Sequence, residues 1–238
     1  MKIKLLVAAA ATVVASSAMA QSAFEGFYGQ LGVGYENNTF GSNTVNVGAK
    51  AGDPTSGTGG TISGPSSTAG GFSGTVGLGY NYAVSPQWLV GLGVDYNPLS
   101  LTSNGNAVCN GCSAQSTVKV SNRLNIFVTP GYAIDKDKLV YLKAGYSMEQ
   151  VQPNLPASAN TFTNNYNPTS NANGYIVGLG YKQLVDKNIY VFGEGNYMGY
   201  SKVSQSGTGN NATGTSQSIA TTTTPSAYQF LVGVGYKF

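Results

Sequence analysis

The chain ends on the stretch Tyr-Gln-Phe-Leu-Val-Gly-Val-Gly-Tyr-Lys-Phe, residues 228–238. Every second position of this stretch is apolar, and the positions between are mostly polar or small. A period of two is typical of a β-strand with one apolar face, because successive side chains of a strand point to opposite sides. The apolar face carries Tyr228, Phe230, Val232, Val234, Tyr236 and Phe238. This pattern decides the fold class, since it recurs along the whole chain.

Seven earlier segments show the same alternation, almost without competition from the 3.6-residue period of a helix. With the last one they cover residues 26–36, 70–82, 87–97, 118–134, 139–149, 174–183, 189–201 and 227–238. We therefore predict an all-β chain that forms an eight-stranded antiparallel up-and-down β-barrel. The last strand is expected to pair with the first, because a barrel in a membrane leaves no strand edge unpaired.

Aromatic residues bracket the aliphatic stretch of four strands at one spacing of eight residues: Phe27/Tyr35, Phe72/Tyr80, Trp88/Tyr96 and Tyr228/Tyr236. Eight residues of a strand tilted by about 40° rise roughly 20 Å, close to the height of the apolar band of outer-membrane barrels, which aromatic girdles border. A soluble sandwich or a lipocalin-like barrel would turn most of its rings inward. The spacing thus favours a transmembrane barrel.

The composition agrees with a membrane barrel. Charged residues make up 9% of the chain, against about 25% in typical soluble domains. The mean hydropathy of -0.07 is also as expected, since lipid-facing apolar residues alternate with polar lumen-facing ones. Without Lys2 and Lys4, which lie in a predicted signal sequence, ten basic residues remain against nine acidic ones. This near-neutral balance argues against a nucleic-acid partner.

The first 20 residues have the parts of a secretory signal. A basic start precedes an apolar run over residues 5–15 and a small-residue exit at Ala18-Met19-Ala20. The alternative is an anchoring helix, but a membrane span needs about 20 apolar residues, and two serines interrupt this run. We expect cleavage before Gln21, which leaves residues 21–238 as one barrel domain.

The connections between the strands alternate in length. The long ones cover residues 37–69, 98–117, 151–173 and 202–226, and the short ones cover residues 83–86, 135–138 and 184–188. Outer-membrane barrels have short periplasmic turns and longer external loops, so we expect both termini in the periplasm and the long loops outside. These loops are rich in Gly, Ser, Thr, Asn and Pro, and we expect them to be mobile and to bury no core.

Several charged residues fall on the inward face of the predicted strands. Asp95, Arg123, Lys143 and Glu194 lie well inside, Glu36 and Glu149 near the outer rim, and Lys182 and Lys237 near the periplasmic rim. Charges in a lumen must be paired or hydrated. We expect Asp95 beside Arg123 on adjacent strands, and Lys143 opposite Glu194 across the interior.

These charges allow two interpretations. One is a polar plug, because the interior of an eight-stranded barrel is about wide enough for side chains alone. The other is a gate whose ion pairs rearrange to pass small solutes. The narrow lumen favours the plug.

Other motifs give little support for chemistry. The pair Cys109 and Cys112 resembles a redox C-x-x-C motif, but it lies in a predicted external loop without a βαβ unit. A structural disulfide is favoured over metal or redox use, because the exported compartment is oxidising. The chain contains no His, so it cannot use a Ser/His arrangement. We expect no enzyme and no cofactor or metal site.

A Gly-apolar-Gly-aromatic unit recurs at Gly32-Val33-Gly34-Tyr35, Gly77-Leu78-Gly79-Tyr80, Gly178-Leu179-Gly180-Tyr181 and Gly233-Val234-Gly235-Tyr236. With the signal sequence and the final Phe238, this unit resembles the opacity-protein-like, OmpA-type family of small bacterial outer-membrane β-barrels. The resemblance covers about residues 26–238, the barrel alone, without the periplasmic cell-wall-binding domain that OmpA carries.

The resemblance implies residence in the bacterial outer membrane, contact with its lipid and lipopolysaccharide, and insertion by the barrel-assembly machinery. That machinery reads a C-terminal strand with alternating apolar residues and a final aromatic residue, here Phe230, Val232, Val234, Tyr236 and Phe238. Members of the family serve adhesion, envelope integrity or minor channels, so the resemblance limits the function only loosely.

Three functions remain open. A structural or surface-interaction barrel leads, a small-solute diffusion channel is the alternative, and a soluble lipocalin-like binding barrel is less favoured. Outer-membrane phospholipases, lipid A-modifying enzymes and omptin-type proteases all rely on His, which this chain lacks. In an adhesin, surface contacts would rest on polar and aromatic loop residues such as Phe162 and Tyr166, and the sequence names no ligand for them.

Overall fold

The computed structural model describes residues 22–41, 43–49, 60–64, 66–109, 112–154, 168–210 and 216–238. Within these ranges the secondary structure consists of strands. No helix with the length and apolar character of a membrane span occurs in the described part of the chain. The signal sequence expected at residues 1–20 lies outside the described residues.

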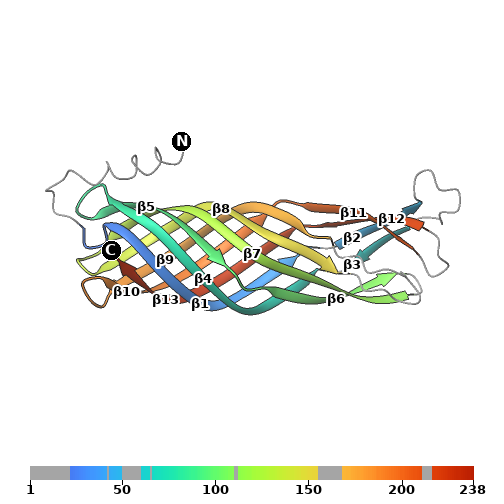
Figure 1. Ribbon diagram of the computed structural model, residues 1–238, viewed down its shortest axis with the longest axis horizontal. Helices are drawn as coiled ribbons and strands as arrows, with labels where there is room; N and C mark the ends of the chain where they lie inside the picture. Colours follow the sequence, from blue (N-terminus) through green and yellow to red (C-terminus); the bar gives the residue numbers. More distant parts are fainter. Residues whose placement is uncertain are drawn as a thin grey trace, which may run out of the picture.

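Eight strands close into an antiparallel barrel (Figure 1). They are β1 (Gly26–Phe40), β4 (Ser67–Ala83), β5 (Trp88–Asn97), β7 (Cys112–Ala133), β8 (Lys138–Asn154), β9 (Ser170–Leu184), β10 (Ile189–Tyr200) and β13 (Pro225–Lys237). Each pairs with its neighbour in the chain order, and β1 pairs with β13 from Tyr28 opposite Lys237 to Phe40 opposite Pro225. The predicted eight-stranded up-and-down barrel and its closing seam are confirmed.

Five further strands lengthen the barrel wall at one end: β2 (Asn43–Ala49), β3 (Gly60–Gly64), β6 (Leu101–Cys109), β11 (Val203–Asn210) and β12 (Ser216–Thr223). Four of them form the sheet β11-β12-β2-β3, and β6 pairs with the outer part of β7. We call this end, at the right of Figure 1, the extended end. The opposite end, with three short turns and the C-terminus, is the turn end.

The strands of the extended end correct one expectation. Much of the sequence assigned to mobile loops, including residues 43–49, 101–109 and 203–210, is paired β-structure. The reason is that a β-ladder satisfies backbone N–H and C=O groups whatever the side chains are, so Ser, Thr and Asn can continue a hairpin beyond the apolar band.

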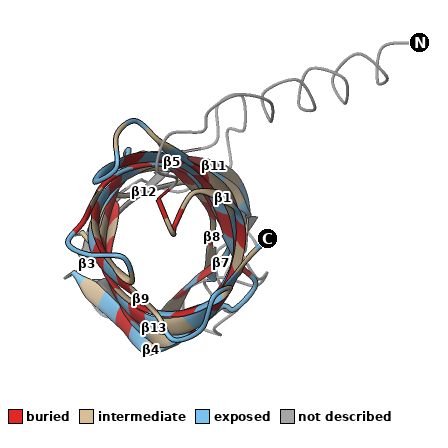
Figure 2. Cartoon of the chain, turned by 90° about the vertical axis from the view of Figure 1, so that its left-hand side faces the viewer, coloured by how far each residue is buried: buried red, intermediate tan, exposed pale blue. Residues whose placement is uncertain are grey.

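Side chains sort to two faces along each barrel strand, as Figure 2 shows by the alternation of buried and exposed positions around the ring. In β5 the alternation is unbroken over ten residues, with Trp88 outward and Leu89 inward at its start. All eight aromatic residues predicted to border the membrane lie on the outer wall; Tyr80 is partly covered by the ring of Phe27, 4.7 Å away.

One bulge interrupts this alternation. The register of β7 against β8 shifts between Ser121 and Leu124, and Asn122 there has a positive φ of 53°. An inserted residue moves the alternation by one position, so Val120 points inward before the bulge and Arg123 after it. The side chain of Asn122 accepts a hydrogen bond from the Tyr96 hydroxyl and donates one to Gln150. The bulge therefore aims Arg123 into the lumen.

Candidate functional site

The most unusual part of the molecule is its filled lumen, and β8 crosses every layer of it. From the turn end to the extended end, the inward residues of β8 include Leu139, Tyr141, Lys143, Glu149 and Val151. They belong in turn to an apolar cluster, a tyrosine cage, an inner ion cluster, an outer ion cluster and a second apolar cluster.

The outer ion cluster is centred on Arg123. Its Nη1 lies 2.5 Å from Oε2 of Glu36, and its Nη2 lies 2.5 Å from Oε2 of Glu149. The guanidinium also donates hydrogen bonds to Asn38 (2.9 Å) and to the hydroxyl of Tyr200 (2.8 Å). One cation thus joins two carboxylates that are supplied by β1 and β8, and the bulge in β7 makes this possible.

The inner ion cluster repeats the arrangement with a lysine. Lys143 Nζ donates to Asp95 at 2.7 Å and to Glu194 at 2.8 Å. The same ammonium lies 4.1 Å from the centroid of the Phe127 ring. Glu194 also accepts a hydrogen bond from the hydroxyl of Tyr141 at 2.7 Å. The low dielectric of a filled lumen makes such pairs strong and costly to break.

Two amides, Gln229 and Asn196, join the two ion clusters. Gln229 donates through Nε2 to Glu36 (3.0 Å) and to Ser73 (2.9 Å), and its Oε1 accepts from Asn196. Asn196 in turn donates to Glu194 at 2.7 Å. The lumen therefore holds one continuous hydrogen-bonded network rather than two separate ion pairs.

A third cation, Lys182, lies nearer the turn end. Its Nζ is 4.0 Å from the centroid of the Tyr28 ring, 4.8 Å from that of Tyr190 and 5.2 Å from that of Tyr141. Lys182 is buried, and among the described residues no carboxylate lies within ion-pair distance of it. The π faces of the three rings supply negative potential in place of a carboxylate.

Apolar clusters close both ends of the network. At the extended end, buried residues of eight strands meet: Phe40, Ala69, Val118, Val120, Val151, Ala172, Ile176, Met198, Tyr200, Val203 and Ala227. We call this group the outer apolar plug. Several of its members come from segments that were expected to bury no core, and that expectation is wrong. Alternating Val, Ala and Phe among the polar residues supply enough apolar surface on the inward face.

At the turn end, Phe24 enters the mouth of the barrel. Its ring is buried among Leu89, Ala133 and Leu139, and its carbonyl accepts a hydrogen bond from Asn81 at 3.0 Å. The chain then turns at Gly26, whose φ of 117° is open to glycine but strained for other residues. This turn lets the segment before β1 fold back, so that Phe24 closes the lumen at the turn end.

The geometry of a closed barrel with an apolar outer wall can now be compared with known proteins. The profile of the family described as outer membrane protein beta-barrel domain matches residues 6–238 of this chain. The chain belongs to this family. It is an outer-membrane β-barrel, as the resemblance seen in the sequence implied.

Solved structures support the same fold for this outer-membrane barrel. The outer membrane protease OmpT from Escherichia coli has a TM-score of 0.54 and 12% identity, over 94% of this chain and 100% of that one. OprG from Pseudomonas aeruginosa has a TM-score of 0.50 and 13% identity, over 90% and 97% of the two chains. Such low identities show a shared fold and transfer no activity. No curated protein sequence matches the chain.

The outer-membrane barrel brings together some of the predicted lumen residues and separates others. Lys143 does meet Glu194. Asp95 and Arg123 do not pair, and that expectation is wrong: Asp95 lies opposite Asn125 in the register, which places Arg123 two residues farther toward the extended end. Lys143 takes Asp95 instead, so the inner cluster has two carboxylates.

Sequence reasoning missed the neutral partners of these charges. Asn38, Tyr200 and Gln229 all occupy inward positions, which the alternation identifies, but their contacts depend on rotamers and on the stagger of the strands around the lumen. The tyrosine cage around Lys182 was missed for the same reason. Within the described residues there is no grouping of acidic or cysteine side chains that could hold a metal ion.

The two cysteines end β6 and begin β7, where Cys109 and Cys112 are register partners. The disulfide between them stays a prediction. The aromatic residues Phe162 and Tyr166 lie outside the described residues.

Proposed function

We propose that this outer-membrane barrel is closed to solutes and has a structural and surface-interaction role. The observation that carries the proposal is the burial of the lumen charges: the six side chains of the two ion clusters are between 0% and 4% exposed. A conducting pore needs a continuous water path along such groups. In this barrel, solvent scarcely contacts these charged side chains, and an apolar cluster closes each end of the lumen.

We further propose that the turn end faces the periplasm and the extended end faces outward. Outer-membrane barrels have short turns on the periplasmic side and longer loops on the outside. The extended end then presents a mostly polar wall of β-strands to the surroundings, with the outer apolar plug as its core. Such a supported wall fits a role in surface contact or envelope integrity.

Conductance tests whether the barrel is closed. The purified protein in planar lipid bilayers is expected to give no current steps above the bare membrane. Glu194→Ala is expected to give none either, because Lys143 keeps Asp95 and the apolar clusters stay in place. Reproducible steps from the wild type would overturn the proposal, and steps only from Glu194→Ala would favour the gate whose ion pairs rearrange.

Adhesion tests the surface role. In one variant a short Gly/Ser linker replaces residues 155–167; a matched variant, Phe162→Ser with Tyr166→Ser, keeps the length of the segment. If aromatic contacts bind a surface, cells that carry either variant should attach several-fold less than wild-type cells. Protein level and heat-modifiable gel mobility serve as controls for assembly. Unchanged attachment in both variants would count against adhesion and favour envelope integrity.

A further inference from the structure

A hollow lies at the turn end of the barrel, beside the segment that precedes β1. Residues 22–23 of that segment form one side of it, and residues 86–87 and 133–136, in the β4–β5 and β7–β8 turns, form the others. This end of the barrel faces the viewer in Figure 2. The sides formed by the turns are partly apolar, through Pro86 and Ile134.

The segment before β1 is fixed as far as Ser22. Ser22 is buried, and its hydroxyl accepts a hydrogen bond from the backbone N–H of Phe24 at 3.4 Å. Its carbonyl accepts another from the N–H of Glu25 at 3.0 Å. The expected cleavage before Gln21 leaves one residue ahead of Ser22, and consecutive Cα atoms are about 3.8 Å apart. Gln21 itself lies outside the described residues, but as the first residue of the processed chain it is within reach of the hollow.

The charges around the hollow do not favour a second cation there. The carboxylate of Asp135 is engaged, since it accepts hydrogen bonds from the Lys138 ammonium at 2.7 Å and from the N–H of Asp137 at 3.1 Å. Lys136 is exposed, and among the described residues no carboxylate pairs with it. Glu25 lines a different hollow, at the end of the closing seam. A free α-ammonium at the start of the chain would therefore repel the ammonium of Lys136.

A chain that begins with glutamine can lose this charge without an oxidant or a cofactor. The α-amine attacks the carbonyl carbon of its own side-chain amide, and the new C–N bond closes a five-membered lactam. The bond from that carbon to the amide nitrogen breaks, and the nitrogen leaves as ammonia with the proton that the α-amine gives up. The product is a pyroglutamyl residue, which carries no terminal charge. Aminopeptidases do not remove it, because they need a free α-amine.

We propose that Gln21 becomes a pyroglutamyl residue after signal cleavage and that its lactam ring occupies this hollow. The ring carbonyl accepts a charge-assisted hydrogen bond from Lys136, and the ring methylene groups pack against Pro86 and Ile134. The neutral ring extends the closure that Phe24 makes and protects the N-terminus from aminopeptidases. The proposal rests on cleavage before Gln21, and it depends neither on the orientation of the barrel nor on whether the barrel conducts.

Mass spectrometry of the processed protein, isolated rapidly from outer membranes, tests the modification. The N-terminal peptide is expected to begin at residue 21 with the mass of glutamine less one ammonia, and to resist an amine-labelling reagent. Gln21→Ser cannot form the lactam and should give an unmodified, reactive N-terminus. A wild-type peptide with a free amine, a peptide that loses ammonia only on storage, or a chain that begins at another residue would overturn the proposal.

Digestion with a pyroglutamyl peptidase tests the position of the ring. The enzyme removes an accessible pyroglutamyl residue, so the folded protein in detergent micelles should be cleaved at least about tenfold more slowly than a synthetic peptide of residues 21–28 that begins with the same ring. Lys136→Gln should raise the rate for the folded protein by about tenfold, the loss of one charge-assisted hydrogen bond.

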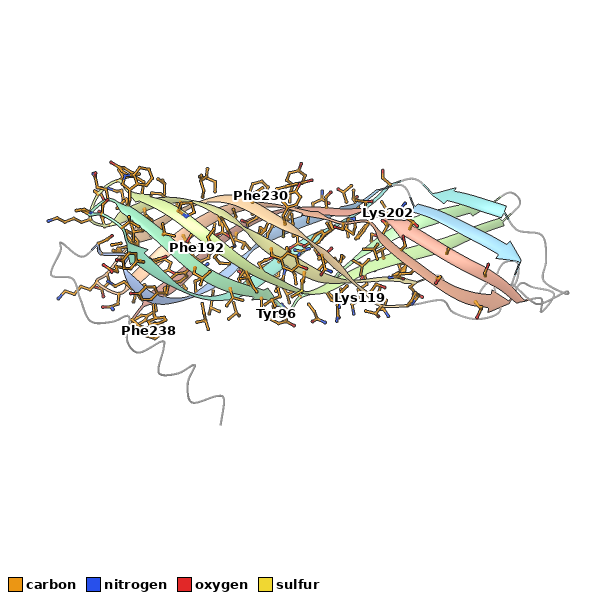
Figure 3. All side chains as sticks on the ribbon, turned by 90° about the horizontal axis from the view of Figure 1, so that it is seen from above. Tyr96, Lys119, Phe192, Lys202, Phe230 and Phe238 are labelled. Atoms are coloured by element: carbon orange, nitrogen blue, oxygen red, sulfur yellow. The ribbon has the colours of Figure 1, made fainter. Side chains whose placement is uncertain are left out.

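Lys119 provides the matched control for Lys136. It is exposed and also lacks an ion pair among the described residues. Figure 3 places it toward the extended end, far along the barrel from Phe238 at the turn end. Lys119→Gln removes the same charge at this distance, so the cleavage rate should stay within about twofold of wild type. Equal rates for the folded protein and the peptide, or equal effects of the two substitutions, would show that the ring does not occupy the hollow.

Discussion

Lys143→Met is expected to lower the free energy of unfolding by about 3–5 kcal/mol, because it leaves Asp95 and Glu194 buried without their cation. Both carboxylates accept a hydrogen bond from the Lys143 ammonium, at 2.7 and 2.8 Å, and among the described residues no other cation pairs with either of them. The measurement is urea unfolding in lipid vesicles, followed by the fluorescence of Trp88, the single tryptophan of the chain.

A neutral version of the inner cluster separates charge from packing. The triple variant Lys143→Met, Asp95→Asn, Glu194→Gln removes all three charges and keeps the volumes nearly constant, so it should recover most of the lost stability. A triple variant as unstable as the single one would mean that packing, not charge, sets the cost. A single variant with wild-type stability would contradict the pairing itself.

Phe40→Ala is expected to make the extended end sensitive to protease on intact cells. Phe40 is fully buried in the outer apolar plug, and truncating a buried Phe typically costs about 3–5 kcal/mol. Because Phe40 is the last residue of β1, where the barrel passes into the extension, the strands beyond it should open to proteinase K while the membrane-embedded barrel stays intact, as seen on gels after digestion.

Phe72→Ala is the matched control for this experiment. Phe72 is 63% exposed on the outer wall and is no part of the plug. Cells with this variant should resist the protease as wild-type cells do. Cleavage at the same rate in Phe40→Ala and wild-type cells would show that the plug does not hold the extension together.

The barrel could be predicted from the sequence because its signal is one-dimensional. The two-residue period of apolar side chains, seen from Trp88 to Tyr96 and from Tyr228 to Phe238, assigns each side chain to the lipid or to the lumen before any strand pairing is known. The closing of the last strand on the first follows from the same reasoning, since a membrane leaves no edge unpaired.

The lumen network could be predicted only in part. Alternation places Asp95, Arg123, Lys143 and Glu194 inside, but it does not give their heights. The height of each charged side chain along the barrel axis depends on the stagger between strands and on the bulge at Asn122. Neither of these can be predicted from the sequence. The extension was missed for a different reason: its strands are polar on one face and only intermittently apolar on the other, so composition suggested loops.

The two-residue link between β10 and β11 has a consequence for how chains of this kind can change in length. Adding one residue there would invert β11, turning Val203 and Gln205 out to water and Ser204 into the plug, while β12 keeps its pairing with β2. Residues added between Asn210 and Ser216, at the tip of the hairpin β11–β12, would change the facing of no strand. We therefore expect changes of length to be tolerated at hairpin tips and to be destabilising at the links.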